Sequence, residues 1–586
     1  MKRIPPRSLA IILLPFLLLA AETKRSDNAT PRVHPFTLKD TSGKDWSWKD
    51  HQASKAIAVL FIGTQCPINN AYMARLAELH KTYAPRGVTF VAINANCQDT
   101  PVRITAHAKE HGIPFPVLKD TANRVADLFG ARRTPEAFVL DTNGRILYRG
   151  RIDDQFGIGY RRAEPTRRDL AEALDEVLAG KPVSQPRTQV AGCAIARTLT
   201  AKEDGPLTYT KHIAPLMQKN CQECHRPGQV GPMSLLTYDD VLSWAETIAE
   251  VVEERRMPPW YADPTIGHFS NDRSLSKAER ETLLAWIKQG CAQGNPADLP
   301  PPRPFAEGWS IGKPDVVFSM PEEFHVPAKG GPKGIRYQYF EVATNFTEDR
   351  WIQAVEARPG NRAVVHHIIV YVVPAGQPFR QNRTDGIGDG LLVAFAPGEL
   401  PAVFQPGTAK KVPKGATLLF QMHYTPNGVA QKDRSCVGLV FAPKPPQYEV
   451  RTRGIAQNRF AIPPGADNYE VKSSTTFDQD ARLLSLMPHM HLRGKAFSYR
   501  VVFPDGKSKL LLRVPRYDFN WQSHYRLRAP LELPAGTRID CTAHFDNSAS
   551  NPNNPDPTQE VHWGDQTWEE MMIGFVDYVF TAKSKE

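Results

Sequence analysis

Apolar runs alternate with helically spaced apolar residues through the first third of the chain. A short, continuously apolar run such as AVLFI is typical of a strand buried on both faces, whereas apolar residues three or four positions apart predict a helix. Strand–helix alternation predicts an α/β domain, which we place at residues 33–193. We expect its buried strands at 58–62, 88–93 and 137–140, and its helices at 70–83 and 102–111.

The pattern changes twice further along the chain. Residues 208–296 keep helical spacing and predict a small all-α domain, and the segment 297–312, with its LPPPRP stretch, predicts a semi-rigid spacer. Beyond it, many short β-rich runs are separated by Pro-Gly turns, which is typical of β-sandwiches. The expected fold class is therefore multidomain: the α/β domain, the all-α domain and two all-β, jelly-roll-like sandwiches at 313–445 and 446–586.

Composition supports a globular chain and excludes several classes of protein. The 586 residues are 41% hydrophobic and 23% charged, which excludes collagen-like, low-complexity and wholly disordered chains. The net charge of +10 is spread over the whole length and no Lys/Arg block stands out, so we expect no nucleic-acid partner. Eight cysteines are too few for a disulfide-stapled scaffold, so each is read for its chemistry.

The first 22 residues have the layout of a secretory signal peptide. Lys2, Arg3 and Arg7 precede an apolar run over residues 9–21 that ends in small residues. An uncleaved anchor is the alternative. No later apolar stretch approaches the length of a spanning helix, so we expect no stable membrane span after cleavage. The signal predicts an exported protein, in a bacterial periplasm or outside the cell.

The helical stretch carries Cys221-Gln-Glu-Cys224-His225, the C-x-x-C-H attachment motif of c-type haem. Two thiols one helical turn apart can bind the vinyl groups, and the adjacent imidazole then lies over the iron. A thioether on the opposite side of the iron suits electron transfer. We expect Met257 to supply it, with Trp260 packed on the ring; Met233 is the alternative. The stretch resembles a small class I cytochrome c.

The β-rich part carries histidines in strands, where neighbouring side chains alternate between faces. His366 and His367 are adjacent, so both can reach one metal only if the strand is distorted. His489 and His491 are two apart and share a face of a strand. Imidazole and thioether are ligands that select copper. Six candidate metal ligands result: His366, His367, His423, His489, His491 and Met571.

In this order, HH, QMHY, HMH and EEM resemble the copper type II, ascorbate-dependent monooxygenases, the family of peptidylglycine α-hydroxylating and dopamine β-monooxygenases. The resemblance covers residues 315–585 and implies two β-sandwiches with one copper each. It implies that His366, His367 and His423 hold an electron-storing copper, and that His489, His491 and Met571 hold the copper that binds O₂ and substrate. Gln421 matches a position near the cleft, and Met572 is the alternative to Met571.

Hydroxylation of a C–H bond by O₂ consumes two electrons, and each copper stores one. The implied partners are therefore O₂, a small-molecule or peptide substrate that the sequence does not name, ascorbate or another external reductant, and an upstream electron donor that delivers through the haem. The animal members brace their sandwiches with several disulfides, whereas this part of the chain has only Cys436 and Cys541. Whether those two meet stays open.

The α/β domain resembles the thioredoxin/peroxiredoxin superfamily. Cys66 follows a central strand at the start of a helix, where the helix dipole lowers the pKa of a thiol, and Pro135 stands where the superfamily has a cis-proline. The motif departs from C-x-x-C because Asn69 replaces the second cysteine. Cys97 and Cys193 are the two candidate resolving thiols. A peroxidase-like site, a non-catalytic scaffold and a copper-delivery thiol are all open.

These observations predict a copper-dependent monooxygenase, an oxidoreductase that uses two copper ions and one covalent haem. The expected catalytic residues are His489, His491, Met571 and Gln421 in the β-rich part and Cys66 in the α/β domain. Two other functions compete with it. The first is an electron-transfer or copper-binding protein without hydroxylase turnover, and the second is a thiol peroxidase-like redoxin with accessory redox domains.

Overall fold

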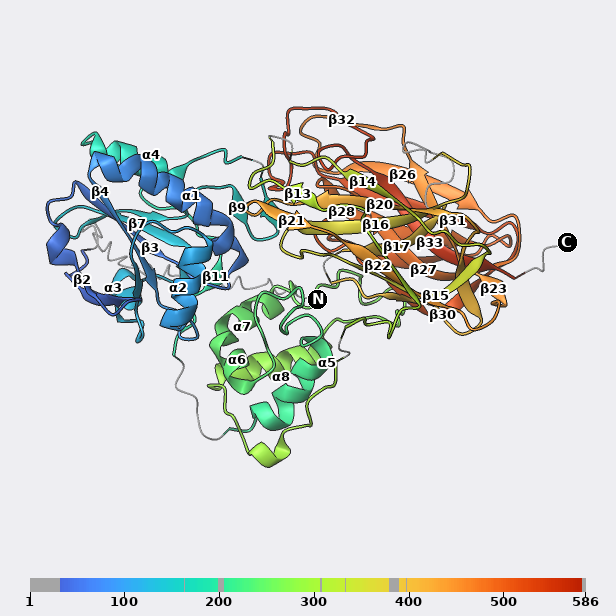
Figure 1. Cartoon of the computed structure of the whole chain (residues 1–586), viewed down its shortest axis with the longest axis horizontal. Helices are drawn as coiled ribbons and strands as arrows, with labels where there is room; N and C mark the ends of the chain where they lie inside the picture. The colour runs from blue at the N-terminus through green and yellow to red at the C-terminus, as the bar shows by residue number, and fades with distance from the viewer. Residues whose placement is uncertain are drawn as a thin grey trace, which may run out of the picture.

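The computed structural model describes residues 32–162, 164–198, 205–305, 308–331, 334–378, 389–396 and 398–581. It shows an α/β part, a helical part and a β-rich part, each with its own place in the molecule (Figure 1). The signal peptide predicted for residues 1–22 lies outside the described residues. No helix in the described ranges is long and apolar enough to cross a membrane.

A seven-stranded sheet forms the centre of the α/β part. Its order is β2 (Asp45–Ser47), β1 (Thr37–Asp40), β5 (Val117–Lys119), β4 (Val88–Asn94), β3 (Ala56–Phe61), β7 (Glu136–Leu140) and β8 (Ile146–Gly150). Strands β5, β4 and β3 are parallel, and β7 is antiparallel to β3. Alternate residues of β3 enter two different cores, so the sheet is covered on both faces. The α/β prediction is confirmed.

Helices cover the two faces of this sheet (Figure 1). They are α1 (Pro67–Tyr83), α2 (Pro101–Glu110), α3 (Arg124–Phe129) and α4 (Asp169–Leu178). Tyr72, Met73, Leu76 and Leu79 of α1 pack into the same core as one face of β3, at the three- and four-residue spacing that the sequence shows.

The helical part packs around a core of its own. It contains α5 (Ala214–Asn220), α6 (Tyr238–Ser243), α7 (Ala245–Glu253) and α8 (Lys277–Lys288). The core gathers Ile213, Met217, Val241, Ile248 and Trp286. Ser276 and Glu279 form a capping box that starts α8. The helical spacing around residues 241–252 is divided between two helices, because α6 ends at Ser243 and α7 begins two residues later.

The β-rich part contains two pairs of sheets, and each pair encloses one core. The first pair has on one side β12 (Val316–Ser319), β22 (Cys436–Phe441), β15 (Arg350–Arg358), β19 (Thr408–Val412) and β23 (Tyr448–Glu449), with β18 (Ala402–Val403) also paired to β15. On the other side it has β14 (Gln338–Ala343), β20 (Thr417–Tyr424), β16 (Val365–Val373) and β17 (Leu391–Phe395). The second pair consists of β24 (Arg451–Gln457), β33 (Met572–Phe580), β27 (Ala481–His489) and β30 (Tyr525–Leu533), packed on β26 (Tyr469–Thr476), β31 (Arg538–Phe545), β28 (Gly494–Val502) and β29 (Ser508–Val514).

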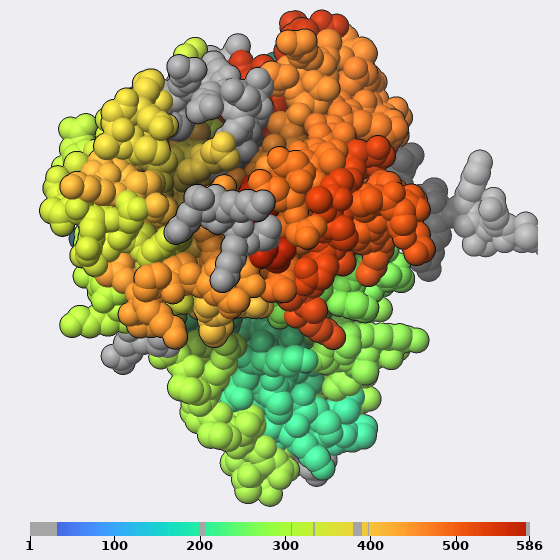
Figure 2. All heavy atoms as spheres, turned by 90° about the vertical axis from the view of Figure 1, so that its right-hand side faces the viewer, coloured from blue at the N-terminus to red at the C-terminus, as the bar shows by residue number. Residues whose placement is uncertain are grey.

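The two sandwiches lie side by side, with the helical part below them (Figure 2). Along β20, Leu418, Phe420 and Met422 point into the first core, so Gln421 and His423 lie on the outer face of that sandwich. The second sandwich repeats the arrangement: Val576 of β33 enters its core while Phe575 does not. The two outer faces line one cleft of about 440 Å³.

Candidate metal and thiol sites

The structure brings His366, His367 and His423 together on the outer face of the first sandwich. His367 pairs directly with His423 across β16 and β20, and the register shifts between Val365 and His367. This bulge inserts His366 as an extra residue, so two consecutive imidazoles reach the same place. One ligand atom from each of the three side chains lies within 4.8 Å of the other two. The predicted strand distortion is confirmed.

These imidazoles are neutral and in part unsatisfied. Burial lowers the pKa of His366 to about 4 and holds the pKa values of His367 and His423 well below the ordinary value of 6.5. The buried Nε2 of His367 and Nδ1 of His423 have no hydrogen-bond partner in the described part of the chain. Leaving a buried nitrogen unpaired costs about 1–3 kcal/mol, so these lone pairs are suited to a ligand.

His489 and His491 form a second group on the outer face of the other sandwich. Burial lowers the pKa of His489 to about 4 and that of His491 to about 3. Nδ1 of His489 donates to Oε1 of Gln522 at 2.6 Å, and Nδ1 of His491 donates to the carbonyl oxygen of Glu569 at 3.1 Å. Both rings therefore present Nε2 as a free lone pair, and Nε2 of His491 is buried without a described partner.

Strand alternation separates the two methionines near the C-terminus. Met572 is fully buried in the core of the second sandwich, whereas Met571 lines the cleft together with His489 and His491. The carboxylate of Glu570 accepts the backbone N–H groups of His491 and Arg493 at 2.8 and 2.6 Å. Glu570 thereby ties the residue before Met571 to the histidine pair. The structure places Met571, and not Met572, beside the two imidazoles.

One phenyl ring lies between the two groups of histidines. The ring of Phe519 stacks on His366 at 5.1 Å and meets the edge of His491 at 6.0 Å. Phe519 and Gln522 come from the loop between β29 and β30, which the sequence analysis did not single out because neither residue belongs to a motif. The side chain of Phe519 therefore separates the first histidine group from the second.

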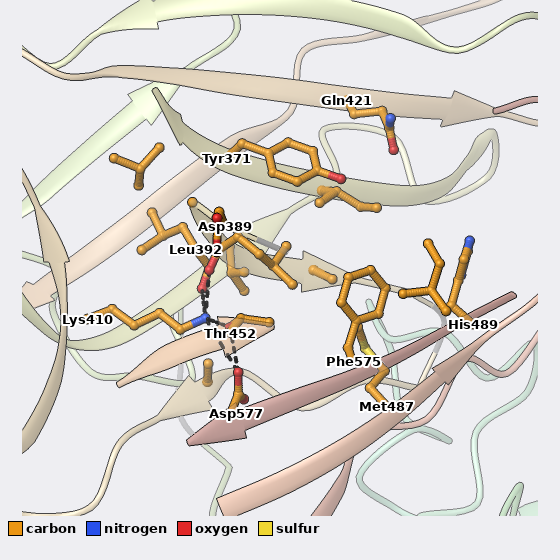
Figure 3. A pocket seen from close by; sticks show the side chains of 18 of the residues that line it. Tyr371, Asp389, Leu392, Lys410, Gln421, Thr452, Met487, His489, Phe575 and Asp577 are labelled. Atoms are coloured by element: carbon orange, nitrogen blue, oxygen red, sulfur yellow. Dashed lines mark hydrogen bonds and ion pairs between the residues drawn. The ribbon is translucent and has the colours of Figure 1, made fainter. Parts of the chain in front are cut away.

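The cleft extends from the histidines between the two sandwiches. Gln421 and Tyr371 lie on one side of it, and Met487, His489 and Phe575 lie on the other (Figure 3). Nε2 of Gln421 donates to the hydroxyl of Tyr339 at 2.8 Å, which fixes the side chain of Gln421. Met487 was not among the predicted site residues, although it stands two residues before His489 on β27 and therefore shares its face.

A buried ionic network lies at the far end of the cleft. Nζ of Lys410 donates to the carbonyl of Leu391 at 2.7 Å and to the hydroxyl of Thr452 at 2.9 Å (Figure 3). It also lies 3.9 Å from the carboxylate of Asp577. Against the cost of burial, Lys410 and His524 hold the pKa of Asp577 far below its ordinary value. Lys410 belongs to the first sandwich and Asp577 to the second, so the network joins them.

The C-x-x-C-H residues follow directly after α5, in a turn that begins at Cys221. The backbone N–H of His225 donates to the carbonyl of Cys221 at 3.0 Å, which closes one helical turn. Nδ1 of His225 donates to the carbonyl oxygen of Met233 at 3.3 Å, so its Nε2 carries the lone pair. Cys221 and Cys224 are free thiols, and burial raises the pKa of Cys221 to about 12.

Trp260 packs outside the core of the helical part, and its predicted contact with a haem ring stays a prediction. Trp260 is buried in the core of the second sandwich, where its ring contacts Tyr525 at 4.8 Å and Phe269 at 6.0 Å. The segment after α7 leaves the helical part and runs along β30, because its apolar residues find a larger core there. Met257 is half-buried at the start of this segment, and its role as an iron ligand stays a prediction.

Cys66 is buried at the N-terminus of α1, with 1% of its surface exposed. The Thr134–Pro135 peptide bond is cis, as expected, and the sulfur of Cys66 lies 3.1 Å from the carbonyl oxygen of Thr134. Burial opposes ionisation, but hydrogen bonds from the Cys193 thiol and from backbone N–H groups outweigh it and lower the pKa of Cys66 to about 7. Oδ1 of Asn69 accepts a hydrogen bond from the backbone N–H of Gly63, which fixes the loop between β3 and α1.

The structure separates the remaining cysteines into different surroundings. Cys193 reaches Cys66, since its backbone N–H lies 3.4 Å from the Cys66 sulfur. Cys97 is half-buried, and its sulfur contacts Gln98. Cys436 stands on β22 of the first sandwich and Cys541 on β31 of the second, and both are free thiols. These two cysteines do not form a disulfide.

Comparison with known proteins supports the identity of the α/β part. Residues 30–149 match the model of the AhpC/TSA family, so this part is a redoxin domain of the thioredoxin-like kind. Thiol-disulfide oxidoreductase ResA of Bacillus thuringiensis (strain Al Hakam) is 27% identical over 112 residues, which are 19% of this chain and 63% of ResA. ResA of Bacillus subtilis (strain 168) is 28% identical over 112 residues, or 19% of this chain and 61% of ResA.

The chain thus spans less than two thirds of the curated relatives that it matches. Among solved structures, a hypothetical protein from Sinorhizobium meliloti 1021 is 35% identical and covers 30% of this chain and 96% of its own, with a TM-score of 0.28. An uncharacterised protein from Geobacillus kaustophilus is 30% identical, with the same two coverages and a TM-score of 0.27.

Proposed function

We propose that the chain is a copper-dependent oxidoreductase, a monooxygenase that hydroxylates a C–H bond with O₂ and receives its electrons through a covalently bound haem. The observation that carries the copper site is the convergence of His366, His367 and His423, whose ligand atoms lie within 4.8 Å of one another. In both histidine groups, buried imidazole nitrogens that have no hydrogen-bond partner among the described residues support it.

The residues present fit copper in both groups. The first group offers three imidazoles that burial keeps neutral, and the second offers two imidazoles and the thioether of Met571. Imidazole with thioether suits copper that changes between its two oxidation states. Bound copper would supply one electron at each group and would activate O₂ at the thioether-containing one.

The chain's own residues set the conditions for that chemistry. Gln522 and the Glu569 carbonyl fix which nitrogen of His489 and of His491 faces the cleft. Phe519 keeps the two groups on opposite sides of one ring, and the cleft offers a substrate apolar contacts from Phe575 and Met487. A substrate held there would lie beside His489.

The free thiols of Cys221 and Cys224 and the orientation of His225 fit a covalent haem. We place haem attachment, and therefore the whole protein, outside the cytoplasm. The test is the haem content of purified protein. Cys221→Ala and Cys224→Ala are expected to lose covalent haem absorbance, whereas Cys291→Ala, a buried cysteine of the same helical part, retains it. Equal haem content in all three variants contradicts the assignment.

A thiol-dependent redox activity of the N-terminal domain is the second candidate. The low pKa of Cys66, its place at a helix N-terminus and the match to the redoxin family favour it. This activity requires no copper and uses none of the residues proposed to hold copper or haem.

Reductant-dependent O₂ uptake by the copper- and haem-loaded protein tests the monooxygenase. We expect His489→Ala to abolish the uptake and Cys66→Ser to leave it unchanged. Copper binding without O₂ uptake in the presence of a metabolite or peptide extract favours the electron-transfer protein instead. Uptake that survives His489→Ala removes the monooxygenase.

A further inference from the structure

Cys193 lies close to Cys66 in space although the two residues are far apart in the sequence. Strand β11 (Cys193–Ala194) pairs with β6 (Arg133–Thr134), and Cys193 lies opposite Thr134, whose carbonyl oxygen contacts the Cys66 sulfur. The Cys193 backbone N–H points at the same sulfur, 127 residues away in sequence. The segment 191–196 therefore brings a cysteine to Cys66 from the side of the cis-proline, while Asn69 holds the second-cysteine position of α1.

Two features hold this segment against Cys66. Gly192 has φ of +153°, and a Cβ at this position would lie 2.1 Å from the Thr134 carbonyl oxygen, so only glycine permits the approach. Nη1 of Arg133 donates to the Gly192 carbonyl at 2.7 Å, and its Nη2 pairs with Glu250 of α7 at 2.7 Å. The segment is built to bring Cys193 to this position.

The two thiols are unequal in both charge and access. The Cys193 thiol donates a hydrogen bond to Cys66, which favours the thiolate at Cys66 and raises the pKa of Cys193. Cys66 is almost fully buried, whereas Cys193 is half-buried. With 1% of its surface exposed, Cys66 is closed to a protein disulfide, so its oxidant has to be a small molecule.

We propose that Cys66 and Cys193 are a redox pair that closes to a disulfide when a small hydroperoxide oxidises Cys66. The inference rests on the thiol-redox candidate and is independent of the copper sites. The Cys66 thiolate attacks the peroxide oxygen, the O–O bond breaks, and with one proton taken up Cys66 becomes a sulfenic acid and water or an alcohol leaves. The Cys193 thiol then attacks that sulfur, and a second water leaves as the S–S bond forms. Two molecules of an external thiol reduce the pair again, entering at the more exposed Cys193.

Peptide mapping of the full-length, haem- and copper-loaded protein tests the pair. The protein is treated with hydrogen peroxide at about one equivalent, its remaining thiols are blocked, and the peptides are identified by mass. We expect a peptide that joins Cys66 to Cys193, with both thiols lost in equal amounts, and the same peptide from Cys97→Ser, a matched half-buried cysteine of the same domain.

The Cys193→Ser variant separates this inference from the thiol function itself. We expect its Cys66 to accumulate as a sulfenic acid that a dimedone probe captures. A disulfide from Cys66 to Cys97, or a sulfenic acid at Cys66 in wild type with Cys193 still free, overturns the pairing and leaves the thiol function intact. No oxidation of Cys66 in either protein contradicts both.

Discussion

His367 lies directly opposite His423 on the neighbouring strand, and the bulge that precedes His367 adds His366 to the same ligand cluster. In a regular strand His366 and His367 would point to opposite faces of the sheet. The bulge breaks the ladder locally and leaves buried ring nitrogens without a partner among the described residues, and a bound metal would offset both costs.

We expect His366→Ala to weaken Cu(I) binding at the first group by more than about 100-fold. Replacing a residue that only orients a ligand costs about 10–100-fold in metal affinity, and losing a ligand costs more. Competition with a chromogenic Cu(I) chelator measures the effect. His325→Ala, an exposed histidine on β13 (Phe324–Val326) of the same sandwich, is the control and should bind as wild type. Equal affinity in both variants removes His366 from the site.

Substitutions of the adjacent residues Met571 and Met572 should have opposite effects on stability and on copper binding. Met572→Ala deletes a fully buried side chain and is expected to lower the free energy of unfolding by about 2–5 kcal/mol. Met571→Ala should change stability by less than about 1 kcal/mol and weaken copper binding at His489 and His491. Urea unfolding and the chelator competition measure the two effects. Copper loss from Met572→Ala, with Met571→Ala unchanged, reverses the assignment.

The buried pair of Lys410 and Asp577 should hold the two sandwiches together. Asp577→Asn leaves the Lys410 charge without its counter-charge and is expected to cost about 3–5 kcal/mol. Lys410→Met removes that stranded charge, so the double variant should be more stable than Asp577→Asn alone. Urea unfolding of the β-rich part measures both, and equal stability of the single and double variants contradicts the coupling.

Ionisation of Cys66 should be visible at neutral pH. Its pKa is about 7 in the folded protein, below the ordinary 9.0, so the thiolate stabilises the fold above pH 9 and this contribution is lost as the pH falls through 7. The ultraviolet absorbance of the thiolate, taken as wild type minus Cys66→Ser, should have a midpoint near pH 7. Cys193→Ala removes the thiol donor beside Cys66 and should raise that midpoint. A midpoint near 9 excludes the hydrogen-bonded thiolate.

Local sequence patterns predicted individual strands and helices, but they did not predict contacts between residues that are far apart in the chain. The apolar run at 58–62 overlaps β3, and the adjacent histidines indicated the bulge, since both signals lie within a few neighbouring residues. The contact of Trp260 with Tyr525 could not be predicted because the two residues lie far apart in the chain. Phe519 and Gln522 could not be found for the same reason: a loop position acquires its role only when two distant strands meet.

The metal content of the full-length protein tests the central claim most directly. After expression with copper and haem supply and removal of loosely bound metal, elemental analysis should give two copper atoms and one iron atom per chain. His423→Ala and His489→Ala should each retain about one copper. Zinc in place of copper, or less than one copper per wild-type chain, would contradict the proposed copper centre.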